Sequence, residues 1–197
     1  NITLNEQATV EKAATNYAAL TEAQQALVPN KAVLDEAQEK IAQLQAEKAA
    51  NEAAAKAVEE EIAALAQTIT LDDVEAVEKA STNYAALTEA QQVLVMNKAV
   101  LDAAQTTIAK LQSEKAANEA AAQAVVNVIA ALPATVTLAD VVAVQQATAK
   151  YEALTTVQQS LVTNKNVLDA AQEKIAQLQA EKAANEAAAQ TVVAAIN

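Results

Sequence analysis

The chain has 197 residues, a net charge of −12 and no Gly, Cys, His, Arg, Trp or Phe. Without Cys and His it has no thiolate or imidazole to bind a metal ion, and no Gly-rich loop or nucleophile beside a base is visible, so we expect neither an enzyme nor a cofactor. The acidic balance speaks against a nucleic-acid partner, and no apolar stretch is long enough for membrane insertion. Ala, Glu, Gln, Leu and Lys dominate, and these residues predict an all-α fold.

The sequence repeats with a period of 67 residues, and the copies open at Thr3, Thr70 and Thr137. We divide it into repeat 1 (residues 1–69), repeat 2 (70–136) and a truncated repeat 3 (137–197). A chain built from near-identical units usually serves to span a distance, to present an extended surface or to offer several binding sites. It rarely forms a single catalytic centre.

Each copy begins with a helix start signal. In the middle copy, Thr70-Leu71-Asp72-Asp73 is an acidic variant of the capping box. Apolar residues then recur every three or four positions, which predicts a helix that ends near residue 87. The stripe that should face the core consists of Val74, Val77, Ser81, Tyr84 and Leu87.

A second start signal, Thr88-Glu89-Ala90-Gln91, predicts a short helix that ends at Asn97. After Gly, Asn best tolerates the left-handed backbone conformation at a helix C-terminus. We therefore expect Asn97 and its equivalents Asn30 and Asn164 to adopt that conformation. Leu94 and Val95 should close the end of a core.

The third element is a long helix from about residue 98 to 132. Its apolar residues keep an unbroken heptad register, in which the largest are Leu101, Ile108, Leu111, Val125, Ile129 and Leu132. In the middle of the helix, Lys115 and Asn118, like Lys48 and Asn51, place polar side chains at positions of this register. We expect a solvated waist here, with the two halves of the helix facing different partners. An amide crosslink between these side chains is the less favoured alternative.

The simplest packing is an elongated tandem array of three-helix bundles joined by long continuous helices, the connection that spectrin repeats use. The bundles should cover approximately residues 3–48, 52–115 and 119–182. A bundle closed within each copy would leave the stripe of Val125, Ile129 and Leu132 bare, which is costly.

The two ends of this array are incomplete in opposite ways. The first bundle lacks its leading helix, and Gln7 occupies the stripe position of Val74 and Val141. The last helix, at 185–197, has no hairpin to pack on, yet it carries Val192, Val193 and Ile196. It frays, folds back, or completes the first bundle of a neighbouring molecule, which would give weak head-to-tail self-association.

Residues that could carry chemistry have simpler structural explanations. Asp72-Asp73 and Glu59-Glu60-Glu61 lie on helices, where consecutive carboxylates do not converge on one ion. Tyr17, Tyr84 and Tyr151 lie on apolar stripes and are expected in cores rather than at binding surfaces. We therefore assign no catalytic, cofactor-binding or metal-binding residues. The residues singled out are structural core only: Val74, Val77, Tyr84, Leu87, Leu94, Leu101, Ile108, Leu111, Val125, Ile129 and Leu132.

The string from Tyr84 to Val95, followed by Asn97, resembles a helical repeat of large cell-surface proteins of Gram-positive bacteria. The string from Ile129 to Asp140 is similar to the turn between helices in that family. Such repeats form stalks of adhesins and S-layer-associated proteins. The resemblance covers the whole chain and implies an extracellular location on the bacterial cell surface.

These observations predict a structural spacer or stalk that projects other modules or contributes to a surface layer. Its partners would be neighbouring repeats and other domains of the parent protein. Two alternatives stay open: a three-helix module that binds a host protein, and an engineered consensus repeat. The exposed faces are poor in the aromatic and Arg anchors that dominate interfaces, so a host protein is the weaker candidate.

Overall fold

The computed structural model describes residues 2 to 196, and no strand occurs among them. Each copy contains a 3-10 turn, a medium helix, a short helix and a long helix. The 3-10 turns are η1 (Leu4–Glu6), η2 (Leu71–Asp73) and η3 (Leu138–Asp140). The medium helices are α1 (Gln7–Ala18), α4 (Val74–Ala86) and α7 (Val141–Glu152). The short helices are α2 (Glu22–Gln25), α5 (Glu89–Gln92) and α8 (Thr156–Ser160), and the long helices are α3 (Lys31–Ala63), α6 (Lys98–Ala130) and α9 (Lys165–Ile196). The prediction of an all-α array of helical bundles is confirmed.

Local side-chain bonds start these elements where the sequence signals predict. Thr70 N–H donates to Asp73 Oδ2 at 2.8 Å, and Asp72 N–H donates to Thr70 Oγ1 at 3.3 Å. The same reciprocal capping box opens η1, η3 and all three short helices. Each box satisfies backbone donors that a helix end would otherwise leave unpaired.

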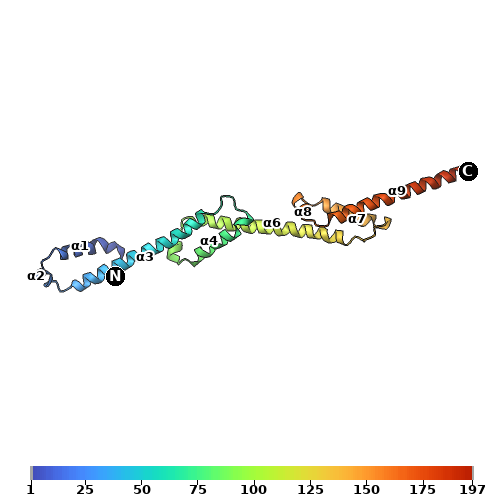
Figure 1. Ribbon diagram of the computed structural model, residues 1–197. Coiled ribbons are helices and arrows are strands. Elements are labelled where there is room, and N and C mark those ends of the chain that lie inside the picture. Colours follow the sequence, from blue (N-terminus) through green and yellow to red (C-terminus); the bar gives the residue numbers. More distant parts are fainter. Residues whose placement is uncertain (1, 197) are drawn as a thin grey trace. The chain divides into compact units, whose positions relative to one another are not determined.

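The chain divides into two compact units, residues 1–109 and 110–197. In the first unit, α1 lies beside the N-terminal half of α3 (Figure 1). Val10 of α1 and Ala37 and Ile41 of α3 form a small core there, against which Ile2 and Leu34 pack.

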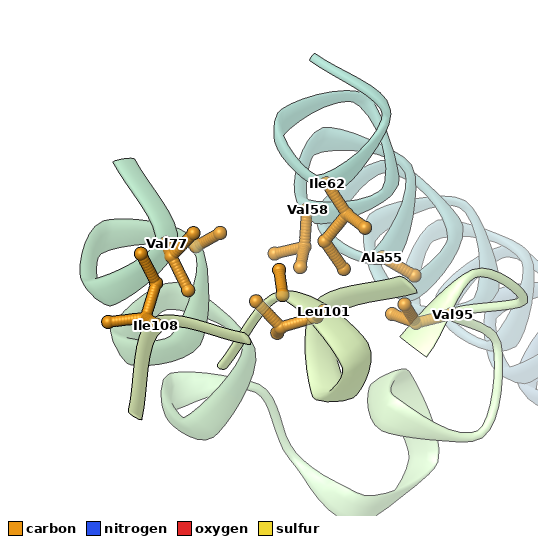
Figure 2. Close-up of a cluster of buried hydrophobic side chains, with 9 residues drawn as sticks. Ala55, Val58, Ile62, Val77, Val95, Leu101 and Ile108 are labelled. Atoms are coloured by element: carbon orange, nitrogen blue, oxygen red, sulfur yellow. The ribbon is translucent and has the colours of Figure 1, made fainter. Parts of the chain in front are cut away.

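The larger core of the first unit joins three helices (Figure 2). The C-terminal half of α3, α4 and the N-terminal half of α6 all contribute buried side chains. Val95, just after α5, closes one end of this core. Its buried members are Ala55, Val58, Ile62, Val77, Ala80, Val95, Leu101, Ala104 and Ile108.

The second unit has an equivalent core between the C-terminal half of α6, α7 and the N-terminal half of α9. Its buried members are Ala122, Val125, Ile129, Val144, Ala147, Val162, Leu168, Ala171 and Ile175. Helix α6 runs unbroken from Lys98 to Ala130. Its N-terminal half belongs to the larger core of the first unit, and its C-terminal half belongs to the core of the second unit.

The expected left-handed asparagines are a wrong prediction. No residue in the range 2–196 has a positive φ, and Asn30 has φ −106° and ψ 24°. The side chains of Asn97 and Asn164 instead donate from Nδ2 to the main-chain carbonyls of Glu59 and Val126, both at 2.9 Å. At these two positions Asn forms a bond to a neighbouring helix and keeps a backbone conformation that other residues also adopt.

Candidate functional site

The acidic runs do not gather around one point. Asp73 binds Thr70 within its capping box. Glu59 Oε1 accepts from Met96 N–H at 2.7 Å, whereas Glu61 Oε2 accepts from Asn83 Nδ2 at 2.6 Å. In the part of the chain that the structure describes, no group of three or more acidic, His or Cys residues could hold a metal ion.

The core residues that we singled out are placed by the structure as follows. Val77, Leu101, Ile108, Val125 and Ile129 are buried. Five others are half-buried, and all of them except Leu111 pack against a core: Val74, Tyr84, Leu87, Leu111 and Leu132.

Leu94 differs from its prediction, because 40% of its surface is exposed. The short helix α5 already ends at Gln92. The turn that follows leaves Leu94 at the surface and places Val95 in the core, as predicted, where it is 7% exposed.

Each tyrosine is half-buried and carries a lysine over its ring. Lys31, Lys98 and Lys165 lie 5.1, 5.4 and 5.3 Å from the ring centroids of Tyr17, Tyr84 and Tyr151. These lysines begin the three long helices, so the contact ties each long helix to the preceding medium helix. The tyrosines therefore stabilise the hairpins. Each hairpin consists of a medium helix, the following short helix and the first half of the next long helix.

Glutamine side chains form hydrogen bonds at the corner of each hairpin, which is where the medium helix ends and the short helix begins. Gln92 Nε2 donates to the main-chain oxygens of Tyr84 at 3.2 Å and Leu87 at 3.1 Å. Gln25 and Gln159 make the same pair of bonds in the other copies. A glutamine side chain therefore satisfies the carbonyls at the end of the medium helix, a task that a glycine C-cap often performs.

A second glutamine connects the corner to the preceding long helix. Gln91 Nε2 donates to Asn51 Oδ1 at 3.0 Å, and Gln158 Nε2 donates to Asn118 Oδ1 at 3.0 Å. The waist that we expected at Asn51 and Asn118 is therefore only partly solvated, since both asparagines are half-buried while Lys115 stays exposed. Sequence reasoning missed this bond, although both partners recur with the period of 67 residues.

A few surface groups have shifted pKa values. The hydrogen bond from Asn83, aided by Lys79 Nζ at 3.2 Å, holds the pKa of Glu61 below its usual value. Hydrogen bonds from Thr3 and Thr137 lower the pKa of Glu6 and Asp140. Asp102 and Asp169 raise the pKa of Lys98 and Lys165 through hydrogen bonds. These partners belong to capping boxes, to i,i+4 pairs along one helix, or to the contact between α3 and α4, so each shift has a structural cause.

The N-terminal hairpin has an open apolar groove of about 530 Å³. Side chains of α1, the corner and α3 line it, among them Val10, Ala13, Tyr17, Leu20, Val28 and Leu34. In the larger core of the first unit, the equivalent face of the hairpin formed by α4 and α6 is covered by the C-terminal half of α3.

None of the helices in the described part of the chain combines the length and the apolar character needed to cross a bilayer. No family model matches the chain, and comparison with curated protein sequences and with solved structures gives no match.

Proposed function

We propose that the chain is a structural spacer, a stalk segment of a bacterial cell-surface protein that separates other modules from the envelope or contributes to a surface layer. The observation that carries the proposal is the sharing of α6. Leu101, Ala104 and Ile108 of this helix belong to one core, and Ala122, Val125 and Ile129 belong to the next.

Sharing a helix stiffens the connection between two cores. A loop can bend at little cost, whereas bending α6 between Ile108 and Ala122 requires its backbone hydrogen bonds to lengthen or break. The intervening residues contain neither Pro nor Gly, and Lys110–Glu114 and Lys115–Glu119 form i,i+4 ion pairs along it. Each pair adds only a few tenths of a kcal/mol, but both favour the uninterrupted helix.

The exposed surface also supports a spacing role. The part of the chain that the structure describes contains no metal cluster, and its perturbed carboxylates and lysines are explained by caps, ion pairs and, for Glu61, the hydrogen bond from Asn83. A net charge of −12 keeps such surfaces apart from one another and from other acidic polymers.

Small-angle scattering on the intact chain tests the proposal. A compact domain of this length has a radius of gyration of about 16 Å, and a spacer must have a clearly larger one. A value near 16 Å would exclude the spacer.

Spin labels test stiffness directly, because the chain has no native cysteine. Thr106→Cys and Glu173→Cys place labels at equivalent exposed positions of two copies, on either side of the shared segment. We expect one narrow distance distribution, which Ala117→Pro should broaden and Ala117→Ser should leave unchanged. A broad distribution in the parent chain would mean that the junction is a flexible joint.

A further inference from the structure

The waist of each long helix, residues 45–51 of α3 and 112–118 of α6, lies between two cores. In both waists the first six residues are exposed and the seventh, Asn51 or Asn118, is half-buried. On α6 the waist lies between Ile108, the last buried residue of one core, and Ala122, the first buried residue of the next. Over this length of about 21 Å the helix is free to bend, unless a contact outside the cores holds it.

Such a contact comes from the corner of the following hairpin. Gln91 Nε2 donates to Asn51 Oδ1, and Gln158 Nε2 donates to Asn118 Oδ1, both at 3.0 Å. These two bonds join a waist to a different helix, whereas the i,i+4 ion pairs of the waists stay within one helix. The glutamine is therefore placed to resist a movement of the waist away from the hairpin.

The donor glutamine is held at its other end by a capping box. Gln158 Oε1 accepts from Thr155 N–H at 3.0 Å at the start of α8, so the amide is fixed at its oxygen and donates with its nitrogen. In α5, Gln91 Oε1 accepts from Thr88 N–H at 2.9 Å in the same way. Because the side chain is already ordered, little conformational entropy is lost when it binds the waist.

The corner itself is fixed to its hairpin on both sides. The neighbouring glutamine, Gln92 or Gln159, donates to two main-chain carbonyls at the end of the medium helix. Val95 and Val162, which follow the short helices, are buried in the cores. A force that bends a waist is therefore transmitted through the Gln–Asn bond to a hairpin that already belongs to a core.

We propose that the two Gln–Asn bonds are braces, that is, hydrogen bonds that position a waist against the following hairpin and limit its bending. A brace at Asn118 shortens the unsupported part of α6, counted from Ile108, from about 21 Å to about 15 Å. Both partners are uncharged amides, so the braces should not respond to ionic strength, in contrast to the ion pairs of the waists. The inference rests on the proposed spacer function, because it names residues that make the connection stiff.

Distances between spin labels at equivalent exposed positions test each brace separately. Thr106→Cys with Glu173→Cys spans the waist of α6, and Glu39→Cys with Thr106→Cys spans the waist of α3. We expect Asn118→Ala to raise the variance of the first distance distribution about 1.4-fold, because the unsupported length of the helix rises by that factor. The second distribution should stay unchanged, and Asn51→Ala should have the reverse effect.

Alanine separates the brace from the stiffness of the helix itself. Ala is a better helix former than Asn, so Asn118→Ala strengthens the local helix while it removes the brace. If the helix hydrogen bonds alone made the waist stiff, the distribution would become narrower or stay equal, whereas a brace requires it to become broader. Ser113→Ala is the matched control, because it introduces Ala at an exposed position of the same waist and should not broaden the distribution.

Changes of donor and acceptor show whether the hydrogen bond is responsible. Asn118→Asp keeps an acceptor for Gln158 Nε2 and should keep the narrow distribution. Adding Gln158→Glu retains a capping box but places two carboxylates against each other, so the double variant should broaden the distribution as Asn118→Ala does. Broad distributions in the parent chain overturn both the spacer and the braces. A narrow parent distribution that Asn118→Ala leaves unchanged, or that Ser113→Ala broadens equally, overturns the braces alone.

Discussion

The two complete cores bury the same apolar positions but differ in the polar residues around them. Val58 and Val125, or Ile62 and Ile129, differ by at most one percentage point in exposure. In the first unit, Glu61 pairs with Lys79 and Asn83 at the rim of the core, whereas the second unit has Val128 in place of Glu61.

This difference separates what the fold requires from what it tolerates. The apolar set, the capping boxes and the Gln–Asn bond at the corner occur in both units. The ion pair occurs in one unit, and the other forms an equivalent core without it. We therefore expect the stability of the array to depend strongly on the apolar residues, moderately on the corner amides and weakly on the rim charges.

The largest effect should come from Ile62 and Ile129, which occupy equivalent positions in the two cores. Ile62→Ala and Ile129→Ala should each lower the free energy of unfolding by about 3 to 5 kcal/mol, because both side chains are fully buried and would leave cavities. Chemical denaturation measures the size, and hydrogen exchange in α4 and α7 shows which core is affected. Gln112→Ala, at an exposed position, should change the free energy by less than about 0.5 kcal/mol. A much smaller loss at Ile129 than at Ile62 would mean that the rim charges strengthen the first core.

A proline in the shared helix should have the next largest effect. Ala117→Pro removes one helix hydrogen bond and clashes with the preceding turn, at a cost of about 3 kcal/mol. Ala117→Ser keeps the bond and should cost less than about 1 kcal/mol. Circular dichroism during thermal unfolding compares the two. If both substitutions shift the midpoint equally, the segment between the cores contributes no helix to stability.

The corner amides should have an intermediate effect that is equal in the two units. Gln91→Ala and Gln158→Ala each lose a capping box and the bond to Asn51 or Asn118. Gln24→Ala loses the capping box alone and is the matched control. We expect Gln91→Ala and Gln158→Ala to lower the free energy of unfolding by about 1 kcal/mol more than Gln24→Ala does. A double-mutant cycle with Asn51→Ala should return a coupling of similar size, and a coupling of zero would contradict the assignment.

The smallest effect should come from Glu61, and it should depend on pH. Because the folded-state pKa of Glu61 is lowered, its contribution is fully present above the unfolded-state pKa and is lost as pH falls through the folded value. Glu61→Gln should cost less than about 1 kcal/mol at neutral pH, and this cost should shrink below about pH 4.3. Glu60→Gln removes the same charge at a more exposed site. Thermal unfolding across this pH range compares them, and a cost that grows toward low pH would contradict the sign.

The elements follow from short sequence signals, because caps and apolar spacing act within a few residues. Thr70 and Thr88 therefore predict their helix starts, and the stripe from Val74 to Leu87 predicts the core face of α4. Contacts between elements follow less readily. The exposure of Leu94 depends on where α5 ends. The role of Asn51 depends on a side chain 40 residues away, and that of Asn97 on a main-chain carbonyl 38 residues away. An exact repeat of Gln and Asn at fixed positions was the available signal for these bonds.

The helix shared by two cores also has a consequence for how the chain acquires its structure during synthesis. Among the described residues, the side-chain bonds between different helices span from 8 residues, as between Gln92 and Tyr84, to 40 residues, as between Gln91 and Asn51. Such short connections favour fast folding. Completion of the core around Ile62 fixes the first half of α6, and its second half can then grow by propagation without a new nucleation step. Each finished core should therefore start the helix of the next one, so that the chain folds in the order in which the ribosome releases it.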